Sequence, residues 1–364
     1  MKKTLIALAL VSLPVAASAE VILYGKIRGG VEFTRDGAQS KNQGPAGSAE
    51  NYQKNSWSVV DYSSYIGFKG SEDLGGNLKV IWQVENRVNL ADKGSGSDSS
   101  KRDTFIGLEG GFGTFKLGHV TSPLKETLDA QDNWEYNSNY LGLGRYGRFG
   151  KRRASLNYHS PDFGGFDFGF QLTPGKNAHG GDTTTNDGRP VFGLGLGYKN
   201  SGFFGRYAVE YARRAAGASG DQKDVHVHNL SVGYDANNLY VAGAFQYGKN
   251  VNPSFNDPAV NPDPYDIAIS AGNEVDAKTK EAQISAAYTF GAVTPKITVA
   301  YGRADTNFRG TDGARYLQAI VGADYAFSRR TTGLVSVGWL RDKVNSDAEH
   351  LNSWGIGTGL VHKF

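Results

Sequence analysis

The final stretch of the chain places bulky side chains at every second position, with glycine in most of the gaps: Trp354-Gly-Ile356-Gly-Thr358-Gly-Leu360-Val-His362-Lys-Phe364. A period of two predicts a β-strand with one apolar face. No later element follows Phe364 in the sequence to cover that face. We therefore interpret this segment as the closing strand of a barrel whose outside faces lipid. A terminal strand of a soluble sandwich is the alternative.

The first residues predict export. Lys2 and Lys3 precede an apolar run at 5–13, and Pro14 and small residues at 17–19 follow it. This pattern is typical of a cleaved signal peptide, which we place at 1–19, with one mature domain at 20–364. No other segment reaches the ~20 consecutive apolar residues of a membrane helix. Barrel strands escape that search, because only every second residue of a strand is apolar.

The mature chain shows the same alternation at its start. Lys26 and Arg28 lie in the middle of a polar face that Tyr24 and Glu32 share. The other face is apolar: Val21, Leu23, Ile27, Val31 and Phe33. A second example follows the turn at 72–77, where apolar residues from Leu78 alternate with Lys79, Ile81, Gln83, Glu85 and Arg87.

Short turns and long loops alternate along the whole chain. The short turns lie at 72–77, 110–113, 160–165, 200–202, 235–238, 290–295 and 328–330. The long polar loops lie at about 36–56, 90–101, 121–151, 173–190, 213–224, 248–279, 304–314 and 341–352. This organisation is typical of an outer-membrane barrel with turns in the periplasm and loops outside, and it predicts about 16 antiparallel strands. The fold class is therefore all-β.

Aromatic residues cluster beside the short turns, where an interfacial girdle of the membrane would lie. They are Phe112, Phe115, Phe163, Phe166, Phe203, Tyr234, Tyr240, Tyr288, Phe290 and Tyr325. The alternative is that they reflect only the ordinary preference of aromatic residues for strands.

Composition and charge exclude several classes. The sequence has no Cys, which excludes a disulfide scaffold and any cysteine metal site or nucleophile. The formal net charge is only +3, which does not favour nucleic-acid binding. We expect neither a cofactor nor a nucleic-acid partner.

The segment 66–75 (IGFKGSEDLG) and the following Trp82-Gln83-Val84-Glu85 resemble the trimeric porins of the neisserial and wider β-proteobacterial type. The matches continue at 105–108, 110–113, Gly118, 122–124 and the closing His362-Lys363-Phe364. The resemblance implies a Gram-negative outer-membrane general diffusion porin of sixteen strands, assembled as a homotrimer, with the third external loop folded into each pore. It also implies contact with outer-membrane lipid and lipopolysaccharide, and insertion by the barrel assembly machinery through the strand that ends in Phe364.

A pore requires a narrow place where size and charge decide what passes. The best candidate is the loop at 121–151, which the resemblance also identifies as the inward-folded loop. The loop residues that we expect at the constriction are Glu126, Asp129, Asp132, Glu135, Arg145 and Arg148. The expected pore-wall residues are Lys26, Arg28, Lys79, Arg87, Lys116, Arg153 and Arg206.

Bases outnumber acids on the expected wall, although Glu32, Glu85 and Glu210 also point inward. We therefore predict a weak preference for anions. For each of these residues the alternative is an ordinary solvated charge. Such charges are tolerated in a wet lumen, whereas a mid-bilayer Arg or Lys on the lipid face costs about 2–4 kcal/mol.

Three other motifs have simpler explanations. Gly142-Leu-Gly144-Arg-Tyr-Gly147 matches a dinucleotide fingerprint but lacks the flanking strand and helix. His226 and His228 share a strand face without a visible third metal ligand. The proline-interrupted acids at 256–266 are typical of a solvated loop rather than of a calcium site.

The sequence thus predicts passive diffusion of small hydrophilic solutes and ions. A substrate-specific channel is the first alternative, with a saturable site along Tyr136, Tyr140, Arg145 and Arg148. A barrel hydrolase is the second, although no Ser, His and acid are paired by spacing to suggest a triad.

Overall fold

The computed structural model describes residues 20–35, 37, 55–91, 102–136, 140–175, 190–213, 216–217, 220–221, 224–252, 255, 276–306, 312–343, 345–347 and 350–364. The expected signal peptide at 1–19 and the acidic run at 256–266 lie outside the described residues. None of the helices in the described part of the chain is long and apolar enough to cross a membrane.

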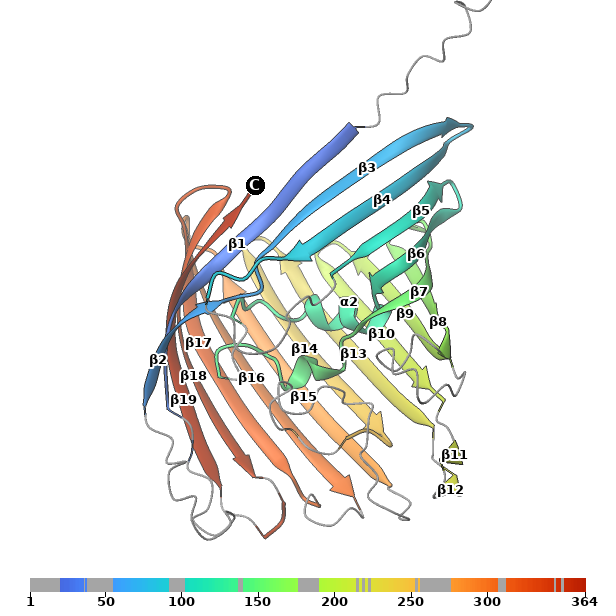
Figure 1. Ribbon diagram of the computed structural model, residues 1–364. Helices are drawn as coiled ribbons and strands as arrows, with labels where there is room; N and C mark the ends of the chain where they lie inside the picture. Colours follow the sequence, from blue (N-terminus) through green and yellow to red (C-terminus); the bar gives the residue numbers. More distant parts are fainter. Residues whose placement is uncertain are drawn as a thin grey trace, which may run out of the picture.

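One antiparallel sheet closes on itself to form a barrel (Figure 1). Strand β1 (Glu20–Arg35) pairs with β19 (Leu351–Lys363), which also pairs with β18 (Thr331–Lys343). The pairing extends to the last residue: Gly25 N donates to Phe364 O at 3.1 Å, and Phe364 N donates to Gly25 O at 3.2 Å. The terminal segment is therefore the closing strand, and the expected fold class is confirmed.

The sheet holds 17 strands in the described part of the chain, but two of them share one position. Strands β2 (Ser56–Asp61) and β3 (Tyr65–Gly75) pair with successive parts of β1. The barrel thus has sixteen strand positions, as the sequence predicts.

The other strands follow one another around the barrel. They are β4 (Leu78–Arg87), β5 (Thr104–Gly110), β6 (Gly113–Thr121), β7 (Arg152–His159), β8 (Phe166–Thr173), β9 (Val191–Asn200), β10 (Phe203–Ala212), β13 (Val225–Ala236), β14 (Leu239–Lys249), β15 (Ala277–Tyr288), β16 (Val293–Thr306) and β17 (Arg315–Ala326). Two short strands, β11 (Ala216–Gly217) and β12 (Gly220–Asp221), pair only with each other.

The seven predicted short turns connect neighbouring strands at one end of the barrel, and the long connections lie at the other end (Figure 1). Gly75, Gly76 and Asn77 adopt positive φ in the first of these turns, a backbone conformation that glycine and asparagine tolerate best. The third long connection carries α2 (Pro123–Asp129) and the 3₁₀ helix η1 (Tyr146–Phe149), and it runs inside the barrel. The inward-folded third loop is therefore confirmed.

Neighbouring residues of each strand face opposite environments. In β15 the exposed fraction is 2% for Gln283, 66% for Ile284 and 0% for Ser285. The exposed apolar side chains form the outer surface of the barrel, and the buried polar side chains lie inside, beneath the third loop. Such an arrangement suits lipid outside and water inside.

The aromatic side chains beside the turns mostly lie on the outer surface, as a girdle requires. Eight of the ten are exposed: Phe112, Phe115, Phe163, Phe166, Phe203, Tyr288, Phe290 and Tyr325. The assignment of Tyr240 was wrong, because its hydroxyl donates to Ala130 O of the third loop at 3.1 Å. Even-numbered residues of β14 face the lumen, so Tyr240 points inward and cannot belong to an outer girdle.

We expect Ile284→Arg to lower the free energy of unfolding in lipid bilayers by about 2–4 kcal/mol, because it puts a cation on the lipid face in mid-strand. Urea unfolding in lipid vesicles measures the change. Ile284→Val is the control and should change stability by less than about 1.5 kcal/mol. Equal stability of the Arg and Val variants would contradict the assignment of the outer face to lipid.

Candidate functional site

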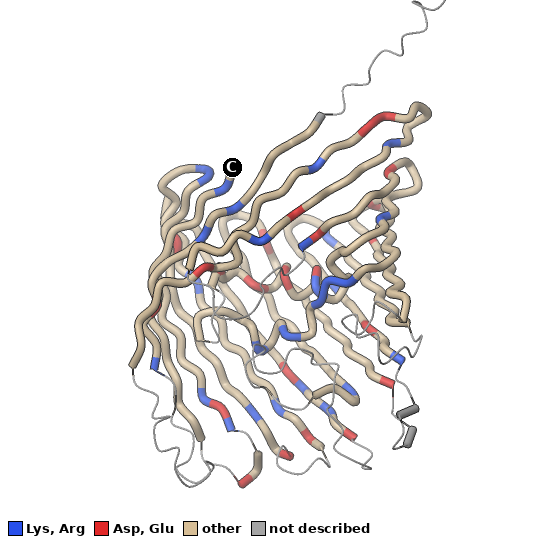
Figure 2. The backbone as a smooth tube through the Cα atoms, in the orientation of Figure 1, with Lys and Arg blue, Asp and Glu red and all other residues tan. Residues whose placement is uncertain are grey.

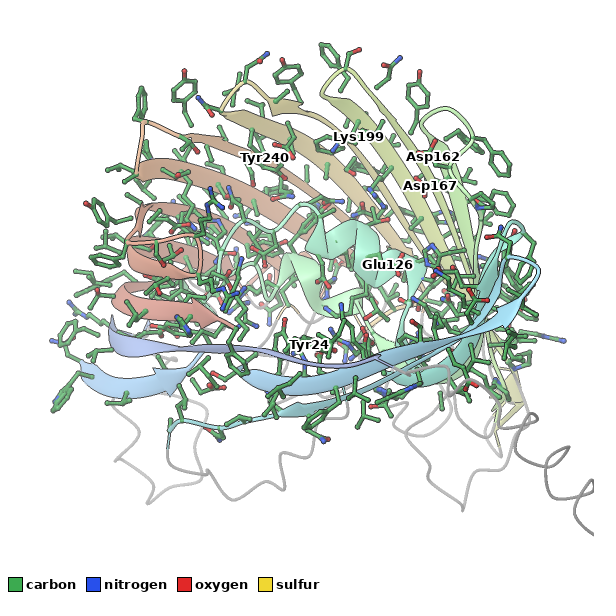
Figure 3. All side chains as sticks on the ribbon, turned by 90° about the horizontal axis from the view of Figure 1, so that it is seen from above. Tyr24, Glu126, Asp162, Asp167, Lys199 and Tyr240 are labelled. Atoms are coloured by element: carbon green, nitrogen blue, oxygen red, sulfur yellow. The ribbon has the colours of Figure 1, made fainter. Side chains whose placement is uncertain are left out.

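The third loop crosses the barrel interior as a packed structure. Ser122 caps the N-terminus of helix α2, because its hydroxyl accepts the Lys125 N–H at 3.2 Å, and Pro123 is the first residue of the helix. Leu124 and Leu128 on α2 pack with Val191, Ala208 and Val227 of the barrel wall. Figure 3 shows α2 with Glu126 in the interior and Tyr24 on a different part of the wall.

Hydrogen bonds attach the middle of the loop to the wall. Gln131 Nε2 donates to Asn229 Oδ1 at 2.7 Å, and Trp134 Nε1 donates to Thr298 Oγ1 at 2.9 Å. Tyr136 donates its hydroxyl to Gly357 O at 3.0 Å. These partners come from β13, β16 and β19, so the loop spans the lumen from one wall to another.

Two buried ion pairs fasten the last part of the loop. Arg148 Nη1 lies 2.5 Å from Glu281 Oε2, and this oxygen also accepts the Tyr316 hydroxyl at 3.0 Å. Arg145 Nη2 lies 2.9 Å from Asp342 Oδ2. The structure thus places Arg145 and Arg148 between the loop and the wall rather than on an open passage.

A water-accessible cavity of about 660 Å³ lies between the third loop and the wall around β1 to β4. Its charged lining residues are Lys26, Arg28, Arg87, Arg102, Lys125, Asp129, Asp132, Glu135 and Arg152. Its aromatic lining residues are Tyr62, Tyr65, Trp134 and Tyr136. Figure 2 shows basic and acidic positions meeting in this part of the interior.

Glu135 on the loop faces two cations of β1. Its two carboxylate oxygens accept from Lys26 Nζ and Arg28 Nη1. Burial alone opposes ionisation of Glu135, but Lys26 and Arg28 outweigh it and lower the pKa of this carboxyl below its usual value. The carboxylate is therefore charged throughout the neutral and mildly acidic range.

The break between β2 and β3 positions two arginines of the wall. Asp61 accepts the N–H groups of Ser63 at 2.9 Å and Ser64 at 3.2 Å, which supports the positive φ of Ser63. Ser63 O accepts from Arg28 Nη2 at 3.2 Å, and Ser63 Oγ accepts from Arg87 Nη2 at 2.5 Å. The sequence predicts one continuous strand here and gives no sign of the break.

The remaining predicted residues lie away from the cavity. Glu126 Oε1 contacts His159 Nε2 at 3.2 Å, and Arg153 Nη1 lies 2.8 Å from Glu210 Oε2 in a buried pair. Lys79 is exposed near the β3–β4 turn, and Lys116 lies 4.9 Å from the Phe105 ring centre. Arg206 is on the inward face of β10, opposite Ser231.

Two arginines that line the cavity are not predicted from the sequence. Arg102 contacts Glu85 through its Nε, and Arg152 Nε lies 3.1 Å from Asp103 Oδ1. Both arginines stand at the junction of a long loop and a strand, where the period of two does not predict direction. The only local indication of a charged site here is the acid Asp103 directly after Arg102 in the sequence.

The described residues contain no group of three or more His, Asp or Glu that could hold a metal. His226 and His228 stack with ring centres 6.4 Å apart, and His228 Nδ1 lies 2.7 Å from the Tyr207 hydroxyl.

Comparisons with known proteins agree with this geometry. The family model described as Gram-negative porin matches residues 35–364. The chain belongs to the Gram-negative porin family. It is 40% identical to the major outer membrane protein P.IB of Neisseria sicca, and 37% identical to that of Neisseria meningitidis serogroup B; both alignments cover 100% of each chain. This porin is therefore an outer-membrane channel and not an enzyme.

Solved porin structures share its fold. The anion-selective porin from Comamonas acidovorans matches with a TM-score of 0.70 at 19% identity, over 95% of this chain and 100% of that one. The Salmonella typhi OmpF complex with daunomycin matches with a TM-score of 0.68 at 21% identity, over 96% and 98%.

We expect Arg148→Gln to weaken the attachment of the porin's third loop by about 3–5 kcal/mol, because Glu281 would stay buried without its cation. Faster hydrogen exchange of the loop amides would measure the weaker attachment, and the noise of the open-channel current should rise as the loop loosens. Arg206→Gln is the matched control, an inward cation without an ion pair in the described part of the chain. Adding Glu281→Gln to the Arg148 variant should restore part of the protection, and loop protection unchanged in Arg148→Gln would count against this anchor.

The lowered pKa of Glu135 predicts a pH dependence. A depressed carboxyl pKa means that the ion pairs persist above the usual Glu value near ~4.3 and are lost only as the pH falls through the lower native value. Asp132 lines the same cavity, and burial raises its pKa to about 7, so wild-type selectivity should shift towards anions around neutral pH as Asp132 gains a proton. In Asp132→Asn, which removes that titration, ion selectivity in bilayers should stay constant from about pH 7 to pH 5 and shift towards anions only in stronger acid. Adding Glu135→Gln to Asp132→Asn should give, at neutral pH, the selectivity that Asp132→Asn alone shows only in strong acid. A selectivity transition of Asp132→Asn between pH 7 and pH 5 would refute the assignment.

Proposed function

We propose that the cavity between the third loop and the β1–β4 wall is the selectivity constriction of this porin. Six cations and three acids line it: Lys26, Arg28, Arg87, Arg102, Lys125 and Arg152 against Asp129, Asp132 and Glu135. Glu85 pairs with Arg102 and Asp103 pairs with Arg152, and these two acids reduce the excess of positive charge around the cavity. The channel is consequently only weakly anion-selective.

Passage is passive and limited by size. The loop is fixed to several strands by hydrogen bonds and buried ion pairs, so the aperture keeps its shape while solutes pass. Acids on the loop oppose bases on the wall, and this transverse field favours polar solutes over apolar ones. Arg145 and Arg148 are occupied with Asp342 and Glu281, so the saturable site expected along them has no support from their contacts.

The proposed partners follow from the family and from the outer surface. The porin assembles as a homotrimer, contacts lipopolysaccharide on its outer face and is inserted by the barrel assembly machinery. The closing strand that ends in Phe364 is the segment that this machinery recognises. Trp354, Ile356 and Leu360 occupy outward positions of this strand, so the strand presents an apolar face before the barrel closes.

Reversal potentials in a potassium chloride gradient test the constriction. We expect wild type to prefer chloride slightly, and Lys26→Gln/Arg28→Gln/Arg102→Gln to prefer potassium, because three cations leave the lining while its acids remain. Lys79→Gln/Lys116→Gln/Arg206→Gln removes the same charge from wall positions outside the cavity and should change selectivity much less. An equal shift in both triple variants would mean that the whole lumen, not this cavity, sets selectivity.

A further inference from the structure

The junction between β2 and β3 holds one residue more than the strand opposite. Asp61 of β2 pairs with Gly29 of β1, whereas Tyr65 of β3 pairs with Lys26. Three residues, 62–64, therefore face only two residues of β1, 27–28. The extra residue makes this junction a β-bulge, a device that redirects side chains beside functional sites. Figure 1 shows β2 and β3 following one another along β1.

Asp61 occupies an outward position of the barrel wall. It shares strand parity with Trp57 and Val59, whose side chains are 73% and 58% exposed. Its pairing partner Gly29 lies in the middle part of β1 (Glu20–Arg35). An ionisable residue at such a position in a membrane protein is costly and indicates a function.

The carboxylate of Asp61 stabilises the bulge. Its Oδ2 accepts the N–H of Ser63 at 2.9 Å, and its Oδ1 accepts the N–H of Ser64 at 3.2 Å. Ser63 has a φ of 68°, in the left-handed region that serine seldom adopts. An aspartate that accepts from the backbone two residues further on forms an Asx turn. This turn holds Ser63 in a conformation that its own side chain does not favour.

Ser63 and Ser64 in turn hold two arginines of the cavity. Ser64 Oγ accepts from Arg28 N and donates to Arg28 O, each at 2.9 Å, so it fixes the backbone of Arg28. Ser63 O accepts from Arg28 Nη2 at 3.2 Å, and Ser63 Oγ accepts from Arg87 Nη2 at 2.5 Å. The hydrogen bonds therefore run through the wall, from Asp61 to two charges that line the cavity.

We propose that Asp61 is a positioning residue for ion selectivity and acts through this bulge. The inference rests on the proposed selectivity constriction and adds a residue that is not among the described residues lining the cavity. Asp61 keeps the guanidinium groups of Arg28 and Arg87 at the cavity surface. Without the bulge these side chains would spread over several rotamers, and their field on passing ions would weaken with distance.

Two replacements that remove the same charge separate positioning from electrostatics. Asparagine forms the same Asx turn, whereas alanine cannot. Asp61→Asn should therefore keep the bulge, and Asp61→Ala should lose it. Each replacement is combined with Arg28→Gln/Arg87→Gln in the full chain, and reversal potentials are measured in a potassium chloride gradient. Heat-modifiable gel migration verifies that each variant is a folded barrel.

In the Asp61→Asn background, Arg28→Gln/Arg87→Gln should shift the reversal potential towards potassium preference. In the Asp61→Ala background the same pair should give about half that shift, because the displaced guanidinium groups already act from a greater distance. Equal shifts in both backgrounds would overturn the positioning role and leave the proposed constriction intact. No shift in either background would overturn the constriction, and the inference with it.

Ser63→Ala gives a measurement that does not depend on the folding of Asp61→Ala. It removes the hydroxyl that accepts from Arg87 and leaves the carbonyl that accepts from Arg28. Arg87→Gln should shift selectivity about half as much in Ser63→Ala as in wild type. Arg28→Gln should shift it equally in both. An undiminished effect of Arg87→Gln in Ser63→Ala would show that the bulge does not position Arg87 and would overturn the proposal.

Discussion

The closed ladder of backbone hydrogen bonds is the constraint on which the rest of the structure depends. Lipid offers no partners to backbone N–H and C=O groups, so an open strand edge in the membrane would leave a row of them unsatisfied. The pairing of β1 with β19, from Lys26 with Lys363 to Arg35 with Trp354, removes that edge. Closure also fixes which residues face inward on every strand. The polar lumen and the apolar exterior are therefore consequences of one register.

The shape of the passage follows from how the two sides of the wall differ. On the β18–β19 side, small residues face the lumen and let the third loop approach closely. A Cβ atom at Gly338 would lie 1.9 Å from Tyr140 O, and one at Gly357 would lie 2.6 Å from Leu141 Cδ1. On the β1–β4 side, the long side chains of Lys26, Arg28 and Arg87 lie between the wall and the loop, beside the cavity. The loop thus closes one side of the lumen and leaves the charged side open.

The sequence predicts this fold well because its evidence is local. Alternation, turn residues and loop lengths can be read within a few positions, and they locate the seven turns and the third loop. The site is harder to predict. Asp129, Asp132 and Glu135 line the cavity. Arg145 instead pairs with Asp342, nearly 200 residues away, and Arg148 pairs with Glu281, more than 100 residues away. Such long-range pairs have no local signal. The break at Ser63 also has no local signal in the sequence, because an Asp-Tyr-Ser-Ser segment fits an extended strand as well as a turn.

Charge obeys different rules on the two surfaces of the same strands. Inside, cations stand at mid-strand, as Lys26 and Arg28 do, because water and Glu135 stabilise them at any height. Outside, cations begin only beyond Tyr301 and Trp339, because hydrocarbon penalises charge below that level. The position of an inward cation therefore indicates which solutes the barrel lets pass. The position of an outward cation indicates where the hydrocarbon layer of the membrane ends. The period of two in each strand distinguishes inward from outward residues. The role of a residue such as Arg303 can therefore be assigned only when the direction of its side chain is known.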